Sequence, residues 1–68
     1  MITGKEAARL INYYESEHFL SDEELDNLIS FLKEMVNFLV NSKEGSAAHY
    51  YYNKLESFEH IRRIRNEK

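Results

Sequence analysis

The clearest pattern in this chain is a heptad-like spacing of apolar residues near its centre. Five residues recur at steps of three and four, the spacing of a helix that packs against another helix: Leu25, Leu28, Leu32, Met35 and Leu39. Ser21 and Glu24 form a capping-box motif before this run, because each can satisfy a free backbone N–H of the other. The pattern predicts a helix over residues 22–43, with Gly45 supplying the left-handed position that ends it.

The apolar surface of this predicted helix is broad. Further apolar residues flank the seam on both sides: Ile29, Val36, Val40, Phe31 and Phe38. At 100° per residue the apolar arc spans roughly 200°, about twice that of a surface helix. One neighbouring helix cannot cover such an arc, so we expect this helix to be buried on more than one side.

A shorter helix is predicted before it, over residues 4–17. Thr3 and Glu6 form a second capping-box motif. Four apolar residues then recur at helical spacing: Ala7, Leu10, Ile11 and Tyr14. This stripe is short, so the element is the minor helix of the predicted fold.

The last part of the chain predicts a long helix over residues 47–66, with Ser46 as its N-cap. Its main apolar stripe contains Ala48, Tyr51, Leu55 and Phe58, and a second line, rotated by ~100°, contains Tyr50, Ile61 and Ile64. Of the three consecutive tyrosines, we expect Tyr51 to face the core. Tyr50 and Tyr52 then flank the core, lie in a protein interface, or stack on a ligand.

Together these elements predict one all-α domain over residues 1–68, a short first helix followed by a long antiparallel αα-hairpin. Both long helices carry more apolar surface than the hairpin hides. We therefore expect self-association to complete a helical bundle, with a two-fold dimer favoured. The predicted interface comprises apolar residues of both long helices: Phe31, Met35, Phe38, Leu39, Tyr50, Ile61 and Ile64. The alternative is a monomeric three-helix bundle in which the first helix covers the remaining surface.

Composition excludes several classes of protein. The 68-residue chain has no cysteine, which excludes disulfide scaffolds and thiolate zinc sites. His18, His49 and His60 are too scattered to converge on one metal ion, and we expect no metal and no cofactor. The longest apolar run, 38–40, is far shorter than the ~18 residues of a membrane span. The first residues show no signal-peptide pattern, so we expect a cytoplasmic protein without a membrane partner.

Catalytic and DNA-binding motifs are also missing from the sequence. There is no glycine-rich phosphate loop, no G-x-S-x-G and no H-E-x-x-H motif, so we expect a protein that is not an enzyme. Duplex DNA is a disfavoured partner because the net charge is −3. In addition, the start of the third helix, where a helix-turn-helix protein reads bases, contains no basic residue.

Charge is unevenly distributed along the chain. Acidic residues gather before and at the start of the central helix, and basic residues gather at the end of the chain. These charges complement helix dipoles, pair with each other within the hairpin or between subunits, or bind an anionic ligand. A nucleotide site would use tyrosines for stacking and arginines for phosphate: Tyr13, Tyr50, Tyr52, Arg62, Arg63 and Arg65. Within the third helix these two groups lie ~20 Å apart and could meet only across a subunit interface.

These observations predict a small non-enzymatic helical binding protein. We expect it to act stoichiometrically as an inhibitor, adaptor or regulator of another protein, and to do so as a homo-oligomer. The alternative is an oligomer that sequesters a nucleotide with tyrosine stacking and C-terminal arginines.

Overall fold

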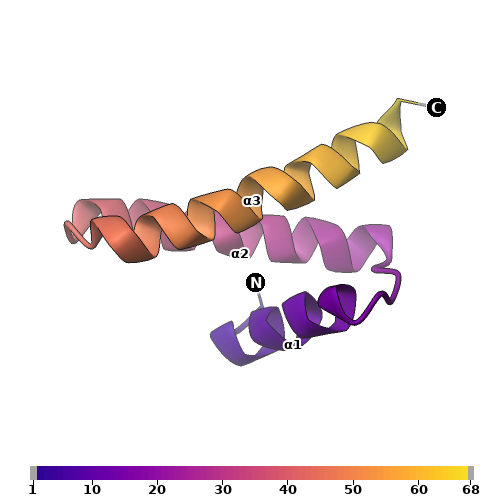
Figure 1. Ribbon diagram of the computed structural model, residues 1–68, viewed down its shortest axis with the longest axis horizontal. Helices are drawn as coiled ribbons and strands as arrows, with labels where there is room; N and C mark the ends of the chain where they lie inside the picture. The colour runs from indigo at the N-terminus through magenta and orange to yellow at the C-terminus, as the bar shows by residue number, and fades with distance from the viewer. Residues whose placement is uncertain (1, 68) are drawn as a thin grey trace.

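Three helices make up the computed structural model, which describes residues 2–67 and shows no strand among them. They are α1 (Gly4–Glu15), α2 (Asp22–Asn41) and α3 (Gly45–Asn66). α2 and α3 pack antiparallel as a long hairpin, and α1 crosses one side of it (Figure 1). The predicted all-α fold with an αα-hairpin is confirmed. The two end residues of the predicted domain, 1 and 68, lie outside the described part.

The start of α2 is held by the capping box that the sequence predicted. The Ser21 hydroxyl accepts a hydrogen bond from the Glu24 backbone N–H at 3.1 Å, and the Glu24 carboxylate accepts one from the Ser21 N–H at 2.9 Å. The Ser21 backbone hydrogen bond holds the pKa of Glu24 below its usual value. Only half of the second predicted box forms at α1. Thr3 accepts from the Glu6 N–H at 3.2 Å, while the Glu6 side chain pairs with Arg9 instead.

The helices end differently from the sequence prediction. α1 stops at Glu15 rather than at residue 17, and α2 stops at Asn41 rather than at residue 43. The left-handed positions that follow them are occupied by Glu17 (φ 66°) and Lys43 (φ 61°), so the prediction that Gly45 supplies this position is wrong. Gly45 is instead the first residue of α3, and Glu44 rather than Ser46 is the N-cap, with no side-chain hydrogen bond.

Both helix ends follow the same hydrogen-bond pattern. After α2, the Lys43 N–H bonds to the Val40 carbonyl at 3.1 Å and the Glu44 N–H to the Leu39 carbonyl at 2.8 Å. After α1, the N–H groups of residues 17 and 18 bond to the carbonyls of residues 14 and 13 in the same way. This is the Schellman motif, which requires one left-handed residue whatever its side chain.

Replacing Lys43 with glycine should stabilise the protein. A non-glycine residue in the left-handed region carries a steric cost that glycine avoids, partly offset by the greater freedom of glycine in the unfolded chain. We expect Lys43→Gly to raise the free energy of unfolding by about 0.5–1 kcal/mol, measured by thermal denaturation followed by circular dichroism. The matched control is Ser42→Gly, at φ −89°, which should destabilise instead. A stabilisation of both variants would contradict the strain argument.

The core lies where the three helices meet. It is built from apolar residues of every element and of the α1–α2 connection: Ala7, Leu10, Leu20, Leu25, Leu28, Ile29, Leu32, Leu55 and Phe58. Four residues of the predicted heptad seam are buried as expected, whereas Met35 is only half-buried. Tyr51 packs against this core, as predicted.

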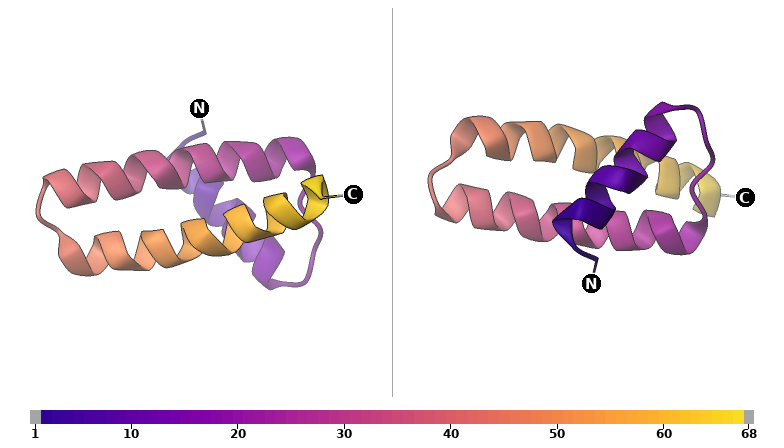
Figure 2. Two further views of the ribbon diagram at one scale, coloured as in Figure 1. Left: turned by 90° about the horizontal axis from the view of Figure 1, so that it is seen from above. Right: turned by 90° about the horizontal axis from the view of Figure 1, so that it is seen from below.

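α1 covers only the half of the hairpin that holds the start of α2 and the end of α3 (Figure 2). At its first turn, the position of a Cβ on Gly4 lies 3.7 Å from the ring of Phe31. At its last turn, Tyr14 packs edge-on against Phe58, with ring centroids 5.2 Å apart. The end of the hairpin that carries the Lys43–Glu44 turn extends beyond α1 and is not covered by it (Figure 2).

Candidate functional site

The uncovered end of the hairpin, residues 35–53, is named here the hairpin tip. Outside its turn, the tip contains no Asp, Glu, Lys or Arg: neither residues 35–42 of α2 and its cap nor residues 45–53 of α3 carry a charge. Charged residues make up 31% of the chain, so their exclusion from these two facing stretches is a marked departure from the rest of the molecule. Depletion of charge combined with aromatic enrichment is typical of the centre of a protein interface.

Four large apolar side chains of the hairpin tip are exposed. The exposed fractions are 63% for Phe38, 59% for Val40, 54% for Tyr50 and 46% for Tyr52. All four belong to the half of the hairpin that α1 does not cover (Figure 2). Exposed apolar side chains that gather in one part of a small protein often mark an interaction site.

These four side chains lie on two different faces of the hairpin. Phe38 is two helical turns from Phe31, which α1 touches, and Tyr50 is one turn from Lys54, which pairs with Glu15 of α1 at 2.6 Å. Residues spaced by four or seven share one face of a helix, so Phe38 and Tyr50 lie on the side that carries α1. This surface is called the α1-side face below.

Val40 and Tyr52 lie on the opposite side, called the groove face. A shallow apolar groove there is lined by residues of both helices: Val36, Val40, Gly45, Ala48, His49 and Tyr52. One to two turns further along the hairpin, Lys33 and Glu59 form an ion pair at 3.5 Å on the same side. The groove therefore gives way to a charged surface where the hairpin tip ends.

Lys54 borders the α1-side face and fixes the aromatic side chains beside it. Its ammonium lies 5.5 Å from the centroid of the Tyr50 ring, and Tyr50 meets Tyr51 edge-on at 5.4 Å. The hydrogen bond that Lys54 donates to Glu15 raises the pKa of Lys54. The same lysine thus ties the end of α1 to α3 and orients Tyr50 at the edge of the uncovered surface.

The residues of the predicted interface fall into two groups. Met35, Phe38, Tyr50 and Ile64 are half-buried or exposed and remain available for contacts. Leu39 is only 9% exposed in the single chain and offers little surface to a second copy. Phe31 and Ile61 are partly buried against the core of the chain itself, since α1 covers that half of the hairpin. Within the single chain, α1 therefore covers one half of the hairpin (Figure 2).

The basic end of α3 pairs with the acidic start of α2. Arg62 donates a hydrogen bond to Asp26 at 3.2 Å, and Arg65 donates one to Asp22 at 2.9 Å. Arg65 also lies over the ring of Phe19, 4.2 Å from its centroid. Arg62 and Arg65 therefore pair with acidic residues within the hairpin, which is one of the arrangements that the uneven charge distribution allows.

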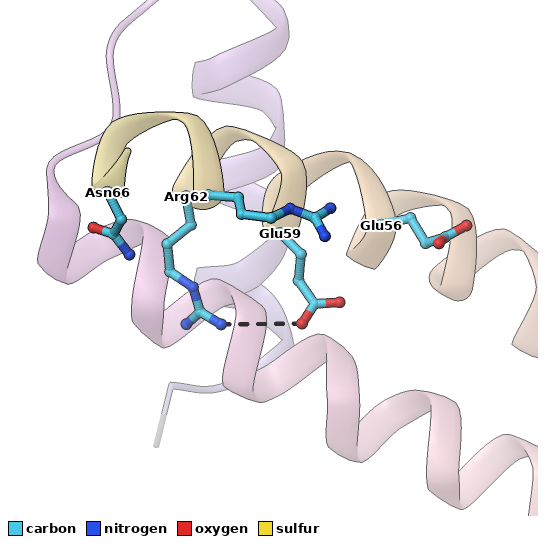
Figure 3. Close-up of a pocket in the computed structure, with 5 residues that line it drawn as sticks. Glu56, Glu59, Arg62 and Asn66 are labelled. Carbon is cyan, nitrogen blue, oxygen red and sulfur yellow. Dashed lines mark ion pairs between the residues drawn. The ribbon is translucent and has the colours of Figure 1, made fainter. Parts of the chain in front are cut away.

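The residues of the predicted nucleotide site do not come together within one chain. Tyr50 and Tyr52 lie at the hairpin tip and the arginines at the opposite end of α3, while Tyr13 stacks on His18 with ring centroids 4.5 Å apart. A depression at the basic end is lined by Glu56, Glu59, Arg62, Arg63 and Asn66, and Arg62 there approaches Glu59 at 4.0 Å (Figure 3). The carboxylates of Glu56 and Glu59 would repel a bound anion, and no aromatic ring lines this depression.

Two further features bear on chemistry. Residues 2–67 contain no group of three or more His, Cys, Asp or Glu side chains placed to hold a metal ion. Within the same range, no helix is long and apolar enough to cross a membrane.

The groove face was not part of the predicted interface. The helical spacing predicts flanking positions for Val36 and Val40 and a place in the core stripe for Ala48, and it gives His49 no partner for a metal site. The signal that would have located them is present in the sequence, because the two charge-free stretches can be found by inspection. Their significance depends on the antiparallel hairpin, which places one stretch against the other.

Comparisons with known proteins identify no relative. No protein-family model matches the chain, and no curated protein and no solved structure is similar to it at a significant level.

Proposed function

We propose that this protein is a small, non-enzymatic helical binding protein that works in the cytoplasm as a homo-oligomer. It acts stoichiometrically on another protein, as an inhibitor, adaptor or regulator. The observation that carries the proposal is the pair of stretches without Asp, Glu, Lys or Arg in the hairpin tip, residues 35–42 and 45–53, with Phe38, Val40, Tyr50 and Tyr52 exposed. An exposed apolar surface of this kind gains free energy only when another apolar surface covers it.

The distribution of polar groups supports binding rather than catalysis. Active sites place a few polar groups with altered pKa values in an apolar cavity. Here the apolar groove at the tip contains one histidine and no carboxylate, lysine or arginine. The charged residues at the other end of the hairpin pair with each other: Asp22 with Arg65 and Asp26 with Arg62. The separation of apolar and charged surfaces favours a role in protein association.

Native mass spectrometry of the gently purified protein tests the homo-oligomer. A mass at a multiple of 8.1 kDa is expected. A small added mass on the oligomer would point instead to a bound nucleotide. A bare monomer over the whole accessible concentration range would overturn the oligomeric part of the proposal.

A crosslinking capture with two baits tests the partner. Tyr52→Glu places a charge on the groove face, and Asn53→Glu places the same charge on the neighbouring exposed residue. We expect a protein captured in equimolar amount by the wild type to be lost with Tyr52→Glu and kept with Asn53→Glu. Equal capture by both variants would contradict the assignment of the tip as the binding surface.

A further inference from the structure

α1 gives the protomer a step on one side. It covers one half of the hairpin and leaves the other half bare, so this side is two helix layers thick at one end and one layer at the other (Figure 2). The bare half presents Phe38 and Tyr50 as exposed rings, and Met35, Ala47 and Tyr51 of the same two stretches are half-buried. From Phe31 to the end of α2 this surface is ~15 Å long, at 1.5 Å per residue.

α1 rises above the hairpin by one helix layer, which is also the thickness of the hairpin tip of a second copy. Packed helices lie ~8–10 Å apart, and a hairpin is one helix layer thick. The hairpin tip of a second copy therefore fits beside α1 in the same layer. The arrangement is reciprocal, because the second copy carries the same step for the tip of the first.

Charge also favours a second copy as the occupant. In a two-fold symmetric contact, residues near the axis face their own counterparts, so any charge there meets a like charge. The facing stretches 35–42 and 45–53 contain no Asp, Glu, Lys or Arg, so these two stretches can face their copies without such repulsion.

We propose that the α1-side face of the hairpin tip is the self-association surface, on which two copies overlap tip to tip about a two-fold axis. Phe38 and Tyr50 of each copy pack against the same surface of the other. α2 and α3 of both copies then form a four-helix core, with one α1 in each layer. The proposal rests on the homo-oligomer proposed above and specifies which face forms it. The groove face remains on the outside of the dimer, one groove per copy.

The size of the surface sets the expected affinity. With Phe38 63% and Tyr50 54% exposed, and ~150–250 Å² available per aromatic side chain, the two rings contribute roughly 230 Å² per protomer. A standard interface buries ~800 Å² per partner, so even with the half-buried neighbours this interface is small. We therefore expect a concentration-dependent dimer with a Kd on the order of 1–100 μM.

Sedimentation velocity over about 1–300 μM of the full chain tests the proposal. Phe38→Glu should raise the dimer Kd at least ~100-fold, because it places a charge on each side of the symmetric contact. Its neighbour Asn37→Glu adds the same charge at an exposed polar position, and Val40→Glu adds it to the groove face. Both of these variants should dimerise as the wild type does.

Two controls separate loss of the dimer from loss of the fold. Circular dichroism establishes that each variant is folded, and Phe38→Ser serves as a milder substitution that should raise Kd about tenfold. If Val40→Glu abolishes the dimer and Phe38→Glu leaves it intact, the face is assigned wrongly although the homo-oligomer stands. If the wild type is monomeric at every concentration, both proposals are overturned.

Discussion

Leu32→Ala should lower the free energy of unfolding by about 2–5 kcal/mol. Leu32 is 0% exposed and lies in the core where α2 packs on its neighbours. Removing three buried carbon atoms there costs both their transfer free energy and the cavity that remains. A domain of this size is held by only a few kcal/mol, so we expect the variant to be substantially unfolded near room temperature.

Urea denaturation followed by circular dichroism measures this effect. The matched control is Ile64→Ala, which removes the same number of atoms from a side chain that is 51% exposed. At a protein concentration below that of self-association, the control should change the free energy of unfolding by less than about 0.5 kcal/mol. Equal losses in the two variants would contradict the position of the core.

Leu10→Ala should release α1 from the hairpin. Only Ala7 and Leu10 of this helix are fully buried, and Leu10 is the larger of the two. The remaining attachments at its end are the Tyr14–Phe58 contact and the exposed Glu15–Lys54 pair, which stabilises by less than about 1 kcal/mol. We expect the free energy that protects the amides of α1 to fall by about 2–4 kcal/mol.

Hydrogen exchange measured by mass spectrometry separates α1 from the hairpin. In Leu10→Ala, peptides from residues 4–15 should exchange faster than peptides from the hairpin, because α1 opens first. Ile11→Ala, at a partly buried position, should give a smaller change, and Tyr13→Ala, at an exposed position, almost none. If exchange accelerates equally over all three helices, α1 unfolds together with the hairpin and has no separate opening.

Several predictions from the sequence depended on local rules, and these agree with the structure. The capping box at Ser21 and Glu24 formed because its two hydrogen bonds join residues three apart. The same spacing at Thr3 and Glu6 gave only one of the two bonds, because Glu6 pairs with Arg9. The seam from Leu25 to Leu32 is buried because its spacing places these residues on one side of a helix. Tyr51 points to the core for the same reason.

Other predictions failed because they assigned conformation by residue preference alone. Glycine is the usual residue in a left-handed position, and Gly45 was placed there accordingly. The hydrogen bonds that close α2 require the residue after the C-cap to be left-handed, and that residue is Lys43. The position of the helix end therefore decides which residue is left-handed, even where the side chain disfavours that conformation, as at Lys43 and Glu17.

The hairpin tip shows the division between sequence and tertiary structure most directly. The sequence alone determined three helices, their apolar faces and two stretches without charge, since each depends on residue type and helical periodicity. Tertiary structure decided where α1 crosses the hairpin, and hence that Phe31 is partly covered while Phe38, two turns further along the same face, is exposed. It also decided that Asp22 meets Arg65, residues that lie at opposite ends of the hairpin sequence. These features depend on how helices distant in the chain pack together, which no local spacing of residues specifies.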